Sequence, residues 1–316
     1  MRIIAALLLC LPLWLGAKSS DSEEKEIKKL PSGITYELRG QSFGQNMLSY
    51  FHAKWQTHVN KIPLHFKPFP YSNQLALYKE ERKSAERRFA RTVKVKDEND
   101  IIYMDPAKTL YTIPFFAEVD PEITEEFPPP PYFTVLWEDH TFTKKIRKLC
   151  KPVSSYKELS LPKGRVSIAL HVRRGLRREI VEEVSQNPAK FPPNSYYVEQ
   201  MRKLNEIFKG IPLYVHVFTD YKFPEEIMEE LEKELELPNV LFGCRKGVNN
   251  SRAHVVDDFY NMSRFMCLIR PISNFSLVAE LIGHHAIVIK PVGQRLSQSK
   301  KVIVIDKVHR KIREKE

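Results

Sequence analysis

The sequence predicts an α/β fold in which helices cover both faces of a parallel sheet. From residue 166 to residue 290, short apolar runs alternate with segments whose apolar residues recur at helical spacing. This alternation of strand and helix is typical of parallel sheets covered on both faces. Polar residues follow several of the apolar runs, at the sheet edge where open α/β sheets bind ligands.

Composition sets the class of protein and of partner. The 316 residues are enough for two domains, and 42% hydrophobic residues with 28% charged ones describe a globular chain with a core. The net charge of +11 favours anionic partners: nucleotides, phosphorylated glycans, acidic membranes or nucleic acid. Because no nucleic-acid-binding module is recognisable, we expect no nucleic acid partner. The four cysteines include no CxxC pair, which predicts neither a disulfide framework nor a zinc site and leaves one isolated bridge open.

The N-terminus has the pattern of a targeting segment. Met1–Ala17 has a charged start and an apolar run, which predicts a signal peptide or a short signal-anchor, with possible membrane association; a cytosolic protein with an apolar start is the alternative. Residues 18–30 are a polar tether. We therefore expect a secretory or membrane-anchored protein, in a Golgi-type lumen if eukaryotic and exported or membrane-associated if bacterial.

The first domain is expected over residues 31–160. A strand at Ile34–Leu38 is followed by a glycine-containing turn and then by a helix marked by Met47, Leu48, Phe51 and Trp55. Because a helix N-terminus attracts anions, the turn residues Gly44, Gln45 and Asn46 are ligand candidates, although a turn that only joins strand to helix is the alternative.

The rest of this domain is less regular. Residues 62–71 contain three prolines and are expected to be extended. Residues 128–131 are expected to be a rigid polyproline spacer, with a peptide-recognition motif as the alternative. Residues 74–91 and 142–149 are compatible with helices, and residues 152–163 are expected to connect the two domains.

The second domain is expected over residues 161–316. It begins with a strand over residues 166–172 that leads into Arg173-Arg174-Gly175. Asn194 is predicted to cap the next helix, and Pro224 to open the one after it. The full expected order after the first strand is helix 194–208, strand 213–219, helix 225–235, strand 239–242, helix 258–265, strand 267–271, helix 274–282, strand 286–290 and a further strand at 302–305.

The candidate ligand-binding residues lie at the carboxyl ends of these strands. They are Arg173, Arg174, Thr219, Asp220, Ser273 and Asn274. Arginine binds phosphate oxygens in pairs through its planar fork, so Arg173 is placed where a phosphate would lie; a surface arginine cluster is the alternative. Since neighbouring strand residues face opposite ways, His171 shares the face of Arg173, and Arg174 is a candidate for pairing with an acid inside the fold.

In their order, these residues resemble a known family, the α1,2-fucosyltransferases, and more distantly the α1,6- and protein O-fucosyltransferases. The HxRRxD-type motif of that family corresponds to His171-Val172-Arg173-Arg174-Gly175-Leu176. The matching blocks elsewhere are Ser42-Phe43-Gly44-Gln45-Asn46, Val217-Phe218-Thr219-Asp220, Asp257-Asp258-Phe259-Tyr260-Asn261-Met262-Ser263 and Pro271-Ile272-Ser273-Asn274-Phe275-Ser276.

The resemblance implies a GT-B-like fold, with two Rossmann-like domains and a central donor cleft. It implies an inverting, metal-independent glycosyltransferase that moves fucose from GDP-fucose to a glycan hydroxyl, with Arg173 as the catalytic residue at the diphosphate. No DxD metal motif is evident, and arginine can offset the charge of the leaving group. The implied donor-binding residues are His171, Arg173, Arg174, Thr219, Asp220, Asp258, Ser273, Asn274, Ser276, Gly44, Gln45 and Asn46.

The sequence departs from the family pattern in two places. Leu176 stands where the motif has an acid, and Gly44-Gln45-Asn46 reverses the family's Gly-Asn-Gln order. The alternative function is therefore an inactive protein of the same fold that binds a GDP-sugar or an anionic glycan. Plain helix capping is the alternative role of the serines and Asn274, and no residue is identified as the base that deprotonates the acceptor.

Overall fold

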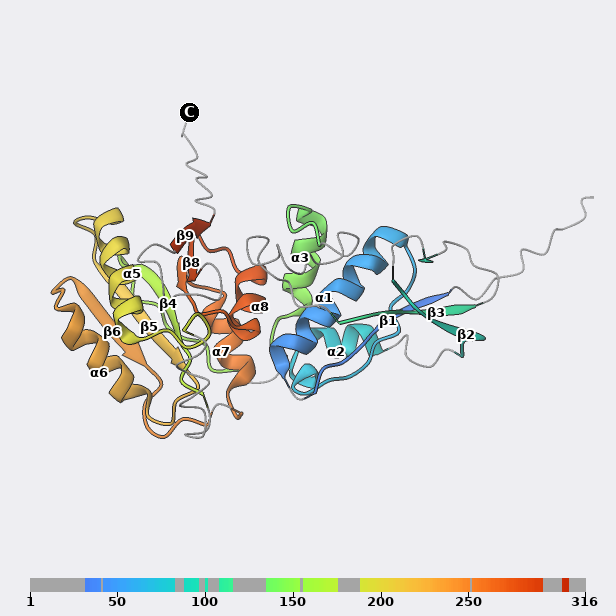
Figure 1. The fold of residues 1–316 in the computed structure, drawn as a ribbon, viewed down its shortest axis with the longest axis horizontal. Helices are drawn as coiled ribbons and strands as arrows, with labels where there is room; N and C mark the ends of the chain where they lie inside the picture. Colours follow the sequence, from blue (N-terminus) through green and yellow to red (C-terminus); the bar gives the residue numbers. More distant parts are fainter. Residues whose placement is uncertain are drawn as a thin grey trace, which may run out of the picture. The chain divides into compact units, whose positions relative to one another are not determined.

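The structure is a computed structural model, and its described residues lie within the unit Pro31–Glu316 (Figure 1). The described ranges are 32–40, 42–82, 88–96, 100–101, 108–115, 135–153, 156–175, 188–250, 252–291 and the backbone of 303–306. The leader, the tether, the polyproline segment and Leu176 lie outside them.

The N-terminal half contains a three-stranded parallel sheet in the order β1-β3-β2. The expected strand and helix around the glycine turn are confirmed as β1 and α1. The helix expected over residues 142–149 is confirmed as α3. The bounds are β1 Gly33–Tyr36, α1 Phe43–Asn60, the 3₁₀ helix η1 Ser72–Gln74, α2 Ala76–Glu81, β2 Arg91–Lys94, β3 Thr109–Ile113 and α3 His140–Leu149.

The helix expected over residues 74–91 is wrong in extent. Helix α2 ends at Glu81, and Arg91 begins strand β2. Strand β2 is an edge strand, largely exposed, with Val93 as its only aliphatic residue, so it lacks the alternation that predicts a strand. Charge alone therefore gave the wrong element there.

The C-terminal half contains a six-stranded sheet in the order β6-β5-β4-β7-β8-β9. The first five are parallel, which confirms the predicted sheet, whereas β9 pairs antiparallel with β8. In chain order the five parallel strands run 3-2-1-4-5, the Rossmann order, and the order reverses between β4 and β7. The bounds are β4 Val166–Val172, β5 Leu213–Thr219, β6 Val240–Cys244, β7 Cys267–Ile269, β8 Ile287–Pro291 and β9 Ile303–Asp306.

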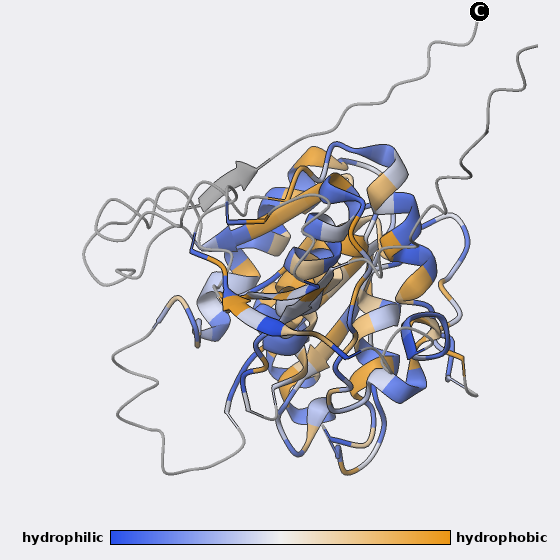
Figure 2. Ribbon diagram, turned by 90° about the vertical axis from the view of Figure 1, so that its right-hand side faces the viewer, coloured by the Kyte–Doolittle hydropathy of each residue, from blue (hydrophilic) through white to orange (hydrophobic). Residues whose placement is uncertain are grey.

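Helices cover both faces of this sheet. Helices α5 (Asn194–Ile207) and α6 (Pro224–Leu235) lie on one face, and α7 (Val255–Met262) and α8 (Asn274–Ile282) on the other (Figure 1). Apolar residues concentrate on the strands and the inward faces of the helices (Figure 2). Pro193 is the N-cap of α5, so Asn194 is its first residue and not its cap as predicted.

The alternation along β4 sends its residues to different helices. Ile168, Leu170 and Val172 belong to the apolar cluster that includes α5 and α6. Ala169 belongs to the cluster on the α7 and α8 face. His171 shares the face of Ala169 and contacts Phe275 of α8, with 5.7 Å between ring centroids.

The structure also bears on the cysteines and on membrane-spanning helices. Among the described residues, the cysteines Cys150, Cys244 and Cys267 are free. No helix in the described ranges is both long and apolar enough to cross a membrane.

Candidate functional site

The candidate site lies at the carboxyl ends of β4 and β7. Strand β4 leads directly into Arg173, and β7 leads through a short loop to Ser273 and Asn274, where α8 begins. Because the strand order reverses between these two strands, the connections after them pass to opposite faces and leave a crevice. The structure thus brings the arginine turn and the start of α8 to the same switch point.

Asp220 holds the turn that carries Arg173. Its carboxylate accepts hydrogen bonds from the backbone N–H groups of Arg174, at 2.7 Å, and Gly175, at 3.1 Å. Gly175 has a φ of 81°, in the region that favours glycine, so the chain turns sharply here. Asp220 was predicted to bind the donor, and its observed contacts position the arginine turn.

The guanidinium of Arg174 is held inside the fold. Nη1 donates to the carbonyl of Pro192 at 2.9 Å, and Nη2 donates to Oδ1 of Asn194. Both partners stand at the start of α5, on the opposite face from His171. The guanidinium of Arg174 is therefore held by a carbonyl and an amide and not by the acid that was expected, and its binding to a donor stays a prediction.

Arg173 and His171 lie together on the crevice side. The guanidinium carbon of Arg173 stands 5.2 Å from the ring centroid of Phe191. His171 is buried, and burial, with smaller contributions from the charges of Arg173 and Arg270, lowers its pKa to about 3. Its Nδ1 is buried without a hydrogen-bond partner among the described residues. His171 is thus a neutral imidazole near pH 7.

Two helix N-termini meet beside these residues. A Cβ on Gly44, the second residue of α1, would stand 2.6 Å from the backbone carbon of Asn274 and 2.7 Å from the nitrogen of Phe275. Only glycine allows this approach. Neither N-cap residue, Ser42 or Ser273, makes a side-chain capping bond, and neither helix has an acid in its first turn. Two partial positive charges therefore lie side by side without a carboxylate from these first turns.

The other predicted residues at these helix starts have local roles. Oγ of Ser276 donates to the carbonyl of Ser273 at 3.3 Å. The amide of Asn46 accepts from the N–H of Arg39 and donates to the carbonyl of Gly40, so it folds the loop before α1. Gln45 is half-buried. The capping alternative is not observed for Ser273.

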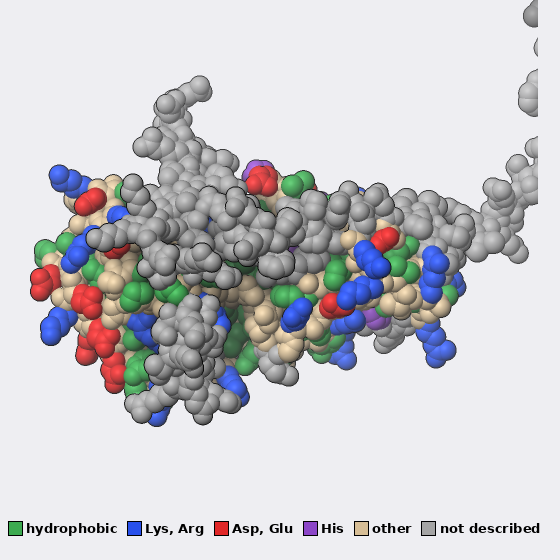
Figure 3. Space-filling model, in the orientation of Figure 1, with side chains coloured by type: hydrophobic (Ala, Val, Ile, Leu, Met, Phe, Trp, Pro, Cys, Tyr) green, Lys and Arg blue, Asp and Glu red, His purple; other side chains and the backbone are tan. Residues whose placement is uncertain are grey.

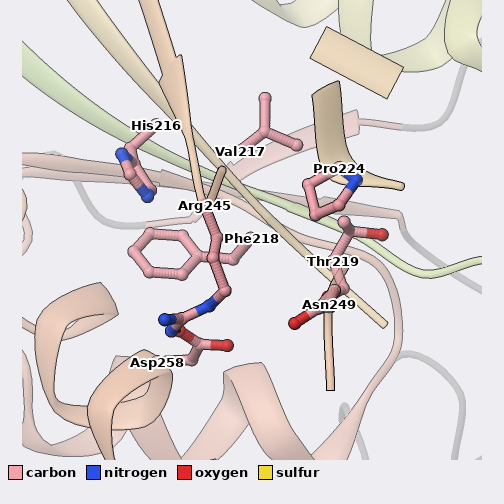
Figure 4. Close-up of a pocket in the computed structure, with 8 residues that line it drawn as sticks. All are labelled: His216, Val217, Phe218, Thr219, Pro224, Arg245, Asn249 and Asp258. Carbon is pink, nitrogen blue, oxygen red and sulfur yellow. The ribbon is translucent and has the colours of Figure 1, made fainter. Parts of the chain in front are cut away.

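A small pocket lies next to this crevice, at the ends of β5 and β6 (Figure 4). Asn249 donates to the carbonyls of Thr219 and Tyr221, which leaves its Oδ1 buried without a partner among the described residues. Arg245 forms an ion pair with Asp258 at 2.5 Å. Burial raises the pKa of the Asp258 carboxyl, and Arg245 opposes that shift. The residues that line the pocket are His216, Val217, Phe218, Thr219, Pro224, Arg245, Asn249 and Asp258.

Sequence reasoning missed three residues of this region. Arg245 follows β6 directly, so the rule that found Arg173 also applied to it. Asn249 lies in a loop with no strand end or helix start to mark it, and its amide group donates to two backbone carbonyls. Phe191 had no signal, because its importance depends on which side chains lie over its ring.

Charge and metal ligands complete the description. Acidic side chains gather on the left of Figure 3, where α6 lies in Figure 1, so the excess positive charge lies elsewhere on the chain. Within the described ranges, no three His, Cys, Asp or Glu side chains form a group that could hold a metal ion.

Comparisons with known proteins return solved structures only. No family model matches the chain, and the curated proteins gave no match. The α1,6-fucosyltransferase NodZ soaked with GDP-fucose is 14% identical, with a TM-score of 0.43, over 87% of this chain and 100% of that one. The fucosyltransferase NodZ from Bradyrhizobium is 13% identical, with a TM-score of 0.42, over 87% of this chain and 99% of that one. POFUT1 in complex with GDP-fucose is 11% identical, with a TM-score of 0.47, over 81% of this chain and 94% of that one.

These similarities are too weak to assign a fold or a function, since their TM-scores are below 0.5. The α/β class rests on the two parallel sheets of the chain itself.

Proposed function

We propose that this chain is a GT-B-type glycosyltransferase that binds GDP-fucose and transfers fucose to a glycan hydroxyl. The observation that carries the proposal is the convergence at the Rossmann switch point of the Arg173 turn with two helix N-termini, at Gly44 and Asn274. The ordered sequence resemblance to fucosyltransferases supports the choice of donor.

The diphosphate of the donor belongs at this switch point. When the glycosidic bond breaks, the leaving diphosphate gains negative charge, and preorganised cationic groups stabilise it. Arg173 supplies a fork of N–H donors, and the helix N-termini supply backbone N–H groups and partial positive charge. We propose that this arrangement replaces a metal ion, so that transfer is metal-independent.

The nucleobase belongs in the pocket between β5, β6 and α7. Its polar wall includes the carboxylate of Asp258 and Oδ1 of Asn249, which has no hydrogen-bond partner in the described part of the chain; both groups accept hydrogen bonds. The Watson–Crick edge of guanine presents donors at N1 and N2, whereas that of uracil has a single donor at N3. The pocket chemistry therefore favours a guanine nucleotide over a uridine nucleotide.

We propose an inverting reaction by direct displacement. The acceptor hydroxyl attacks the anomeric carbon, the bond to the diphosphate breaks, and the hydroxyl proton passes to a base. Neutral His171 lies on the diphosphate side. The base remains without an assigned residue.

The second candidate is a non-catalytic binding protein of the same fold. Leu176 in place of the motif acid is the observation that favours it. The two candidates differ in the fate of the donor, because a binding protein leaves GDP-fucose intact.

Transfer assays on the purified protein test this proposal. With GDP-fucose and a panel of glycan acceptors, we expect release of GDP coupled to fucosylated product. Arg173→Lys should lower turnover by roughly 10²–10³-fold, because lysine keeps the charge and loses the fork. The control is Arg202→Lys, an arginine of α5 that donates to the carbonyl of Glu234. Intact GDP-fucose after incubation would favour the binding protein, and equal turnover of both variants would remove Arg173 from the site.

A further inference from the structure

We infer that His216 determines which nucleobase the pocket accepts: its Nε2 donates to O6 of guanine, and the hydroxyl of Tyr214 holds the imidazole in the tautomer that can donate. This inference rests on the proposed function, because it concerns the base of the proposed donor. Neither residue belongs to the fucosyltransferase-like motif blocks, and the structure alone brings them to the pocket.

His216 lies in the wall of the pocket between β5, β6 and α7. Alternation along β5 puts Tyr214, His216 and Phe218 on the face that α7 covers. The imidazole packs beside the ring of Phe218, with 4.7 Å between the centroids (Figure 4). Since the side chain is buried and faces the same pocket as Asp258 and Asn249, it stands ready to contact a base without moving.

The hydrogen bond between Tyr214 and His216 assigns the tautomer. The Tyr214 hydroxyl lies 2.9 Å from Nδ1 of His216, and in the described part of the chain neither group has a second hydrogen bond. If Nδ1 carried the imidazole proton, the hydroxyl would accept, and its own proton would have no acceptor. We therefore assign the hydroxyl as donor and Nδ1 as acceptor, which places the imidazole proton on Nε2.

Both side chains keep the ionisation state that this assignment needs. Burial, with a smaller contribution from the charge of Arg245, lowers the pKa of His216 to about 4. Burial, with a smaller contribution from Cys244, raises the pKa of the Tyr214 hydroxyl. Near pH 7 the imidazole thus has one proton and the phenol keeps its own.

Gly243 of β6 provides the space for the Tyr214 hydroxyl. It is the residue of β6 that pairs in register with His216. A Cβ on Gly243 would stand 2.7 Å from the Tyr214 hydroxyl, which ends a rigid ring. A side chain at this position would therefore displace the hydroxyl from Nδ1 of His216.

The pocket then offers one donor beside two acceptors. The carboxylate of Asp258 and Oδ1 of Asn249 accept hydrogen bonds, and Nε2 of His216 donates one. Guanine has an acceptor at O6 beside its donors at N1 and N2, whereas adenine has an amino donor at the position of O6. With adenine, the N–H of His216 would face another donor, and a buried donor without a partner costs more than a missing contact.

Arg245 is the other side chain of the pocket that could donate to O6. Its guanidinium is paired with Asp258 at 2.5 Å, and it does not depend on Tyr214 for its protons. Removal of the Tyr214 hydroxyl therefore separates the two donors, because it affects only the tautomer of His216.

The binding test is calorimetric titration of the full chain with GDP, inosine diphosphate and ADP, which differ only in the base. We expect the wild type to bind ADP roughly a hundredfold more weakly than GDP, and inosine diphosphate, which keeps O6, nearly as well as GDP. Tyr214→Phe should lower the preference for GDP over ADP about tenfold. Tyr36→Phe is the matched control, because it removes a buried hydroxyl that donates to the carbonyl of Lys67 in the other sheet. Thermal melting checks that each variant is folded.

Nuclear magnetic resonance of the full chain, labelled with ¹⁵N in histidine, tests the tautomer without any nucleotide. His216→Gln identifies the signals of this imidazole by their loss. In the wild type we expect the proton on Nε2, and in Tyr214→Phe a mixture of the two tautomers.

The outcomes separate this inference from the proposed function. Discrimination against ADP that falls in Tyr214→Phe, with the wild-type proton on Nε2, supports the inference. Wild-type binding of GDP with the proton on Nδ1, or with the same preference in Tyr214→Phe, overturns the inference and leaves the donor proposal standing. The same holds if inosine diphosphate binds as weakly as ADP, because O6 is then not what the pocket reads. If ADP binds as well as GDP, or neither binds the wild type, both the inference and the guanine donor are wrong.

Discussion

At the scale of single residues, Gly44 decides how closely α1 and α8 approach. Helix propensity alone favours Gly44→Ala by about 1 kcal/mol. The added Cβ would stand 2.6 Å from the backbone of Asn274, however, and backbone cannot move aside cheaply. We therefore expect Gly44→Ala to lower the melting temperature and weaken GDP binding, with the neighbouring Gln45→Ala as a control that changes neither melting nor packing. A stabilised Gly44→Ala protein would show that the two helix N-termini do not meet.

Asp220 is a second residue whose role, holding the turn that carries Arg173, can be tested by mutation. Its two oxygens accept from two backbone N–H groups, and the amide of asparagine has only one acceptor oxygen. Asp220→Asn should cost about 1–3 kcal/mol of unfolding free energy and lower turnover, because the turn that holds Arg173 loosens. Urea unfolding and steady-state kinetics measure the two effects. Full activity in Asp220→Asn would mean that the turn is held by other contacts.

At the scale of elements, α8 is held from both ends by the N-terminal half. Gly44 lies against its first residues, and Arg147 of α3 donates to the carbonyls of Ile282, at 2.8 Å, and Gly283, at 3.0 Å, at its other end. A cation at the C-terminus of a helix also opposes the negative end of its dipole. Helix α8 therefore belongs to the crevice through contacts that come from distant parts of the sequence.

We expect Arg147→Met to lower stability by roughly 1–3 kcal/mol, because two partly buried carbonyls lose a charged donor. Lys148→Met, on the exposed side of the same helix, should stay within about 0.5 kcal/mol of wild type. Denaturant unfolding of the two variants provides the comparison. Similar losses in both would show that the α3–α8 contact contributes nothing specific.

The same scale shows what the sequence could predict. Every strand and helix expected between residues 166 and 290 is present. Strands β4, β5, β7 and β8 are largely buried and have the continuous apolar runs of strands covered on both faces, whereas the edge strand β6 is only partly buried. Strands β2 and β3 were missed: β2 is an exposed edge strand, whereas β3 is a five-residue central strand of the small sheet. Arg173 and Asn274 were found from their positions at strand ends, whereas Phe191 and Arg147 act through contacts between distant segments that no local pattern contains.

At the scale of the whole molecule, buried histidines link stability to pH. Burial lowers the pKa of His52 to about 4, of His171 to about 3 and of His216 to about 4. The unfolded chain therefore binds protons first as the pH falls, and the stability that these neutral side chains contribute is present above about pH 6.5 and is lost below it.

We expect each of these histidines to cost roughly 1.4 kcal/mol per pH unit between about pH 6.5 and its folded pKa. Urea unfolding between pH 7.5 and pH 5 should show this loss. In His52→Gln the slope of unfolding free energy against pH should be smaller, because one proton fewer is taken up on unfolding. An unchanged slope in His52→Gln would place that side chain in contact with solvent.

We propose that the crevice between β4 and β7 binds a guanosine diphosphate through Arg173 without a metal ion. Calorimetric titration of the wild type and of Arg173→Lys with GDP, in excess chelator, tests it most directly, with UDP as the comparison ligand. We expect the wild type to bind GDP in chelator and to prefer it to UDP, and Arg173→Lys to bind GDP much more weakly. Loss of wild-type binding on chelation, or equal affinity in the two proteins, would contradict it.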